Sequence, residues 1–147
     1  MQRFFATIVC FSLCAVMATA QAGKGKGGLK VDGTWTATSA AFDGKKLPDE
    51  VIAKIMAVLT FKDGKYTAST MGKEDEAGTY TIDVKKKPAQ IDLLPTSGKD
   101  KDKLQLGLIK IDGDVMTIAA SKNGDKNRPK DFEGGDDIVV MVLKRGK

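Results

Sequence analysis

The side chains that most often carry out catalysis are scarce in this sequence of 147 residues. It contains no histidine, which excludes His-based catalytic triads, His-ligated zinc and imidazole acid–base catalysis. Both cysteines, Cys10 and Cys14, lie in an apolar N-terminal stretch that we expect to be removed, so the mature chain would carry no thiol. Lysine, tyrosine and carboxylate chemistry remains open, but we rank an enzyme last and expect no catalytic residue, cofactor or metal ion.

Acidic residues occur in short clusters that could bind calcium or act as a general acid–base pair. These clusters are at 49–50, 74–76, 100 and 102, 112 and 114, and 136–137. Asp and Gly favour turns, because the Asp side chain bonds the local backbone and Gly accepts positive φ angles, so we place nearly all the clusters in turns. The run Asn123-x-Asp125-x-Asn127 resembles a calcium loop, but Arg128 and Gly134 stand where such a loop needs a glycine and a bidentate acid.

The most distinctive polar and aromatic cluster is Arg128-Pro129 with Phe132, on the long connection before the last predicted strand. An exposed Arg and Phe there could recognise a carboxylate or a partner protein. The interpretation we favour is structural: Phe132 plugs one end of the fold and Arg128 bonds loop carbonyls, because long connections in small barrels need an apolar anchor.

The N-terminus has the pattern of a signal peptide over residues 1–20. Arg3 is its only charge, residues 4–17 are apolar, and Ala18-Thr19-Ala20 is a small-x-small cleavage signal, with cleavage after Ala22 as the alternative. The apolar run is shorter than the roughly 20 residues that span a bilayer, so we expect export to the periplasm or the extracellular space and no stable membrane span. Residues 21–29, rich in Gly and Lys, are predicted to be a flexible linker, and residues 30–147 a single domain.

From Val31 onward the apolar residues alternate with polar ones in short runs separated by turn signals, which predicts antiparallel strands. We expect strands at 31–40, 58–62, 65–71, 78–85, 89–94, 103–111, 115–121 and 137–145. One helix is expected at 48–57, where a proline and two acids precede an apolar stripe, and we expect it to cap an open barrel end rather than act as a lid. Eight antiparallel strands with short connections can close into an all-β barrel without exposed edges.

Composition argues against nucleic acid as a partner. The formal net charge is +5, with acids and bases interspersed, and no aromatic residue of the expected domain sits in a basic run. Single-stranded nucleic acid needs aromatic stacking platforms along a basic groove, and that pattern is missing.

The motif Gly33-x-Trp35 on the first strand, a short helix before the second, six further strands and a late basic residue, Arg145, together resemble the lipocalin or calycin superfamily. The resemblance implies an eight-stranded up-and-down barrel in which Trp35 packs at the closed end with Arg145 over it. Gly33, Trp35 and Arg145 would then form a structural motif. The helix that usually follows the last strand in that family is not found before residue 147.

A closer resemblance spans nearly the whole expected domain. Gly33-Thr34-Trp35, residues 43–48, Gly78-Thr79-Tyr80, Lys87-Pro88, residues 91–93, residues 112–114, Arg128-Pro129-x-x-Phe132 and residues 143–145 are similar to an uncharacterised planctomycete family of small exported lipocalin-like domains. Members have no assigned activity. Ile109 departs from the family pattern, which usually has a tyrosine there.

The interior of the barrel separates two functional hypotheses, because eight strands are just wide enough either to be filled by side chains or to hold one small ligand. The first is a carrier of a small apolar ligand bound inside the barrel. Its predicted lining is Trp35, Phe61, Tyr66, Tyr80 and Leu106. The second is a filled, rigid barrel that acts as a binding or inhibitory module through the loops at 85–88, 97–103 and 123–135.

Overall fold

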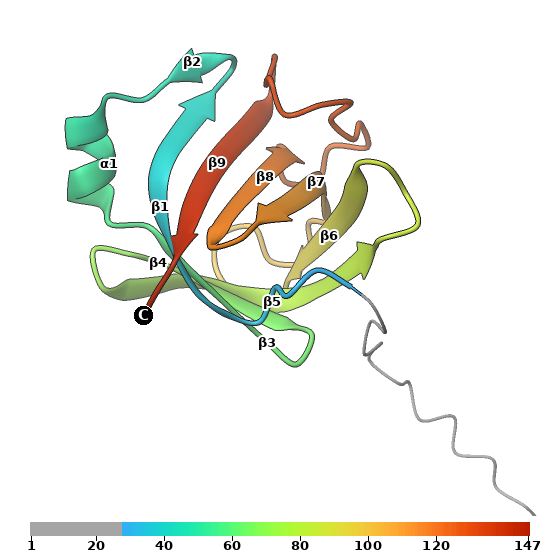
Figure 1. Ribbon diagram of the computed structural model, residues 1–147, viewed down its shortest axis with the longest axis horizontal. Coiled ribbons are helices and arrows are strands. Elements are labelled where there is room, and N and C mark those ends of the chain that lie inside the picture. Colours follow the sequence, from blue (N-terminus) through green and yellow to red (C-terminus); the bar gives the residue numbers. More distant parts are fainter. Residues whose placement is uncertain (1–27) are drawn as a thin grey trace, which may run out of the picture.

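A computed structural model describes residues 28–147, in which the chain forms a closed antiparallel β-barrel with one helix (Figure 1). The elements are β1 (Gly33–Phe42), β2 (Lys45–Lys46), α1 (Asp49–Ile55), β3 (Val58–Lys62), β4 (Lys65–Thr70), β5 (Lys73–Asp83), β6 (Ala89–Pro95), β7 (Gln105–Asp112), β8 (Val115–Ser121) and β9 (Ile138–Arg145). From β3 to β9 each strand pairs with the next; β1 pairs with both β3 and β9, which closes the barrel, and the short β2 pairs only with β1. The predicted eight-stranded up-and-down barrel with a helix after its first strand is therefore confirmed.

The residues in the turns explain why the β3–β4 hairpin was predicted and the β4–β5 hairpin was missed. Asp63-Gly64 joins β3 to β4 with both residues at positive φ, as expected of this dipeptide. Met71-Gly72 joins β4 to β5 with the same backbone signs, but a methionine at φ 52° carries no turn signature. As a consequence β5 begins at Lys73 instead of residue 78, and the acids at 74–76 lie on a strand, not in the turn that we predicted.

The helix is shorter than predicted. It covers Asp49–Ile55, and Met56 at φ 45° ends it in the left-handed conformation, donating its N–H to the Ile52 carbonyl. Among residues 28–147, no helix has the length and the apolar character that crossing a membrane requires.

The domain begins earlier than the predicted boundary at residue 30. Leu29 is half-buried and packs against the core, so the last residue of the predicted linker belongs to the fold because its side chain is apolar. The predicted signal peptide at 1–20 and the linker up to residue 27 lie outside the described residues.

The Gly33, Trp35 and Arg145 motif lies at the end of the barrel where β1 begins and β9 ends. Trp35 is fully buried, its indole N–H donates to the Val31 carbonyl at 2.7 Å, and the Arg145 guanidinium carbon lies 4.1 Å from the ring centroid. Arg145 also donates to the backbone carbonyls of Asp32 (2.8 Å) and Lys30 (2.6 Å). Gly33 has φ 128°, and a Cβ there would lie 2.8 Å from an Arg145 nitrogen, so this glycine makes room for the guanidinium.

Candidate ligand site

Large side chains fill the barrel interior. Seven large apolar side chains are fully buried, and Phe61 meets Tyr80 edge-on with their ring centroids 5.1 Å apart. The seven are Trp35, Phe61, Ile91, Ile109, Met116, Ile118 and Leu143. The interior space that the carrier hypothesis assumed is thus occupied by the protein's own side chains.

The structure distributes the predicted lining residues over three environments. Trp35, Phe61 and Tyr66 belong to the packed core, and Tyr80 is half-buried at its edge. Leu106 was expected inside and lies outside: Ile109 belongs to the core, and alternation along β7 puts Leu106 on the opposite face. Hydrophobicity alone misplaced it, because the loop before β9 also buries apolar residues on the outer wall.

Both tyrosines of the chain donate their phenolic proton to a carboxylate. Tyr66, on β4, donates to Glu76 at 2.6 Å, and Tyr80, on β5, donates to Asp32 at 3.0 Å. Burial, and then the neighbouring carboxylate, raise the pKa of Tyr66 far above its ordinary value and raise the pKa of Tyr80 to about 12. Neither phenol can act as a base at neutral pH, so tyrosine-based proton abstraction is unsuited to this site.

Absorbance of tyrosinate offers a direct check on these contacts. The midpoint for Tyr80 is expected near pH 12, and Tyr66 is expected to stay protonated until the barrel unfolds. Because both pKa values are raised in the folded state, their stabilising contribution is complete below the ordinary value near 10 and declines as the pH rises above it. Ionisation of both phenols near pH 10 in the folded protein would contradict the described hydrogen bonds.

The loop cluster lies on the outer wall of the barrel. Arg128 donates to the carbonyls of Ile91 (3.2 Å) and Gly107 (2.6 Å) and pairs with Asp92 at 2.5 Å. Pro129 is buried, and the Lys110 ammonium lies 4.6 Å from the centroid of Phe132.

These contacts correct the structural interpretation of the cluster. Lys110 points outward, opposite to Ile109, so Phe132 packs against the wall and does not plug a barrel end. Arg128 bonds carbonyls of β6 and β7, not of its own loop, and three of its five N–H donors are engaged there and by Asp92. The side chain holds the loop in place rather than offering a free carboxylate site.

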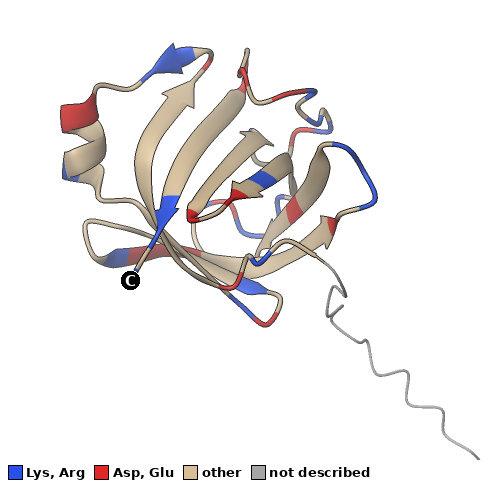
Figure 2. Ribbon diagram, in the orientation of Figure 1, with Lys and Arg blue, Asp and Glu red and all other residues tan. Residues whose placement is uncertain are grey.

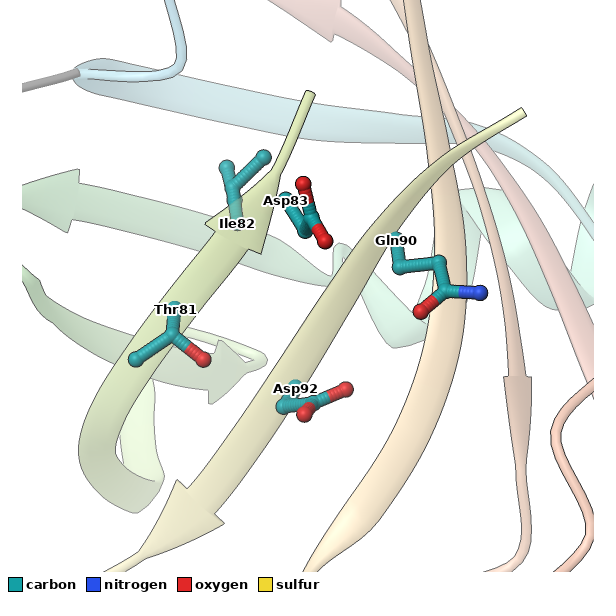
Figure 3. Close-up of a pocket in the computed structure, with 5 residues that line it drawn as sticks. All are labelled: Thr81, Ile82, Asp83, Gln90 and Asp92. Carbon is teal, nitrogen blue, oxygen red and sulfur yellow. The ribbon is translucent and has the colours of Figure 1, made fainter. Parts of the chain in front are cut away.

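A small polar hollow of about 220 Å³ lies between β5 and β6 (Figure 3). Thr81 and Asp83 come from β5, and Gln90 and Asp92 from β6. Asp92 is paired with Arg128, and Asp83 accepts the Lys85 N–H at 3.0 Å. Among residues 28–147 no three His, Cys, Asp or Glu side chains come together as a metal site. The carboxylates of this hollow therefore serve local structure.

An apolar groove of about 510 Å³ lies between α1 and β1. Ile52 and Ala53 of the helix and Met56 just after it form one wall, and Thr36 to Thr38 of β1 form the other, with Val58 and Asp49 completing the lining. Met56 is 54% exposed although it is apolar, while Ile52 is buried. The lining thus combines apolar surface with the hydroxyls of Thr36 and Thr38 and one carboxylate, the composition typical of small-molecule sites.

Strand length explains why a groove forms at this place. β1 has ten residues and β3 has five, so β3 pairs with β1 only from Gly33 to Thr36. Beyond that point the backbone of β1 bonds the Ala57 carbonyl through the Ala37 N–H, and α1 lies beside the part of β1 that β3 leaves uncovered (Figure 1). A seven-residue helix has only two turns to cover this stretch, which leaves the groove open.

Sequence reasoning assigned the helix to capping and did not identify the groove. The usable signal was the width of the apolar stripe. A two-turn helix that packs on one neighbour cannot bury as many apolar side chains as the four at Val51, Ile52, Ile55 and Met56. Only Ile52 of these is fully buried.

No protein-family model matches the chain, and no curated protein matches it in sequence.

Proposed function

We propose that this chain is a non-enzymatic binding protein that takes a small apolar ligand in the groove between α1 and β1. The observation that carries the proposal is the groove itself, about 510 Å³ with three apolar side chains of α1 and its C-cap along one wall. Its volume falls within the range of roughly 300–1,000 Å³ that is usual for small-molecule sites. The filled interior moves the proposed ligand from inside the barrel to this outer groove.

The chemistry of the lining defines the class of ligand. Burial of apolar area on Ile52, Ala53 and Met56 supplies the affinity, and the unbranched Met56 side chain can adapt to ligands of different shape. Thr36 stands on the opposite wall, where its hydroxyl can orient a hydroxyl or carbonyl of the ligand, whereas the Thr38 hydroxyl already donates to the Val142 carbonyl at 3.1 Å and can only accept. A largely hydrocarbon molecule with one polar end fits this arrangement.

Filling the groove tests the proposal. The variant Ala53→Phe is expected to lower the affinity for N-phenyl-1-naphthylamine, an apolar fluorescent probe, by about tenfold or more. Lys54→Phe is the matched control, because it adds the same ring to the same helix at a position outside the groove lining. It is expected to leave the affinity unchanged. Equal probe binding by the Ala53→Phe variant would exclude the groove as the ligand site.

A second function is supported by the packed interior and by the loop that Arg128 holds to the wall. In it the rigid barrel presents its loops to a protein partner, and no small ligand is needed. Native mass spectrometry of the exported protein before and after organic extraction separates the two. A small mass that is lost on extraction supports ligand binding. A bare protein whose Lys99 and Lys126 become protected from acetylation by a partner supports the loops.

A further inference from the structure

We propose that the Trp35 end of the barrel binds the surface of an anionic lipid bilayer. The end is defined by the segments that meet there: residues 28–32, the turns β3–β4, β5–β6 and β7–β8, and the end of β9. We call it the basic end. Closure of the barrel brings these segments together, although in the sequence they are spread from residue 28 to residue 147.

The charges of the chain separate between this end and the rest of the barrel. Ten basic and five acidic side chains lie at the basic end, which gives it a net side-chain charge of +5, whereas the rest of the described chain has a net charge of −3. The basic members are Lys30, Lys62, Lys65, residues 85–87, Lys110, Lys144, Arg145 and Lys147. Figure 2 shows basic stretches on the β5–β6 loop, at the β3–β4 turn and at the end of β9.

Apart from Lys110, which lies over the Phe132 ring, the lysines of the basic end are free to meet an external partner. All nine are exposed, and none takes part in the five ion pairs found among residues 28–147. Three of the five acids have local partners: Asp32 accepts the Tyr80 hydroxyl, Asp83 accepts the Lys85 N–H, and Asp114 lies 3.8 Å from Arg145. The field of this end is therefore set by lysines that no carboxylate neutralises at close range.

Exposed apolar side chains among the lysines favour a lipid surface over a soluble polyanion. Val84 directly precedes the three lysines at 85–87 and is 41% exposed, and Val115 at the β7–β8 turn is 40% exposed. Lysines near an anionic bilayer each contribute about 1 kcal/mol of attraction, and a neighbouring apolar side chain gains by entering the interface.

Vesicle binding of the exported chain tests this assignment. The protein is expected to cosediment with vesicles of phosphatidylcholine containing about 30% phosphatidylglycerol, not with pure phosphatidylcholine, and to dissociate as salt is raised to about 0.5 M. The triple variant Lys85→Gln, Lys86→Gln, Lys87→Gln is expected to weaken binding about 100-fold. The control Lys99→Gln, Lys101→Gln, Lys126→Gln removes the same charge from exposed loops at the opposite end and is expected to weaken it less than about fivefold.

The variant Val84→Asn distinguishes the lipid surface from a soluble polyanion such as heparin. It is expected to weaken vesicle binding about fivefold and to leave heparin binding unchanged, because only a bilayer offers an apolar phase to Val84. Three results would overturn the proposal: no binding to the anionic vesicles, equal losses from the two lysine triples, or a Val84→Asn variant that binds vesicles as the parent does. All the substituted side chains are exposed, so loss of the fold does not explain any of these outcomes.

Discussion

Replacing Trp35 with alanine is expected to lower the free energy of unfolding by about 4 kcal/mol, because the change leaves a large cavity at the end of the barrel where β1 begins. Trp35 is fully buried, and its indole N–H satisfies the Val31 carbonyl at 2.7 Å. The variant also removes the ring beneath Arg145, whose guanidinium carbon lies 4.1 Å from the centroid. Urea unfolding followed by circular dichroism measures the change, since the variant has lost the only tryptophan of the chain.

Thr34→Ala is the matched control on the same strand. Thr34 is exposed, and its substitution is expected to change the free energy of unfolding by less than about 0.5 kcal/mol. A loss below about 2 kcal/mol for Trp35→Ala would mean that the ring is not packed as described, since full burial of so large a side chain requires more. The separate variant Arg145→Met should keep part of the packing over the Trp35 ring but lose the two hydrogen bonds to the carbonyls of residues 30 and 32.

Gly78→Ala is expected to destabilise the barrel by about 3 kcal/mol, because two strands approach so closely at this position that an added methyl group does not fit. A Cβ at this position would lie 2.3 Å from the Leu94 carbonyl oxygen and 2.7 Å from the Tyr66 ring. The ring could rotate, but the carbonyl belongs to the backbone of β6, so β5 and β6 would have to separate. Denaturant unfolding of the variant, compared with the parent protein at unchanged m value, measures the cost.

A second glycine provides the control for this substitution. At Gly146 a Cβ would meet the Thr34 carbonyl at 3.4 Å, an ordinary contact distance, so Gly146→Ala is expected to change stability by less than about 0.5 kcal/mol. The double variant Tyr66→Leu, Gly78→Ala identifies the obstacle. Its loss of stability should be nearly the sum of the losses in the two single variants. If Tyr66→Leu instead removed the cost of Gly78→Ala, the ring and not the carbonyl would limit the space.

The strands were predictable because the information is local, and closure followed from the need to leave no exposed sheet edge. Alternation of side chains along each strand has a period of two, and Asp63-Gly64 marks its turn by backbone chemistry alone. The Met71-Gly72 turn was missed because the methionine adopts positive φ without a side chain that favours it. Leu106 was misplaced for a different reason: both faces of β7 are buried, one by the core and one by the loop before β9, so hydrophobicity no longer identifies the inner face.

The sequence by itself determined that the chain is an all-β barrel with one helix and that histidine chemistry is excluded, and the family resemblance implied that Trp35 and Arg145 stand together. The tertiary structure decided how full the barrel is, because this depends on the register that turns Phe61 and Tyr66 inward toward one core. It also decided where the helix leaves a groove, since β3 ends its pairing with β1 at Thr36. The basic end likewise exists only once the barrel closes, because its charges come from turns far apart in the chain that only the paired strands bring together.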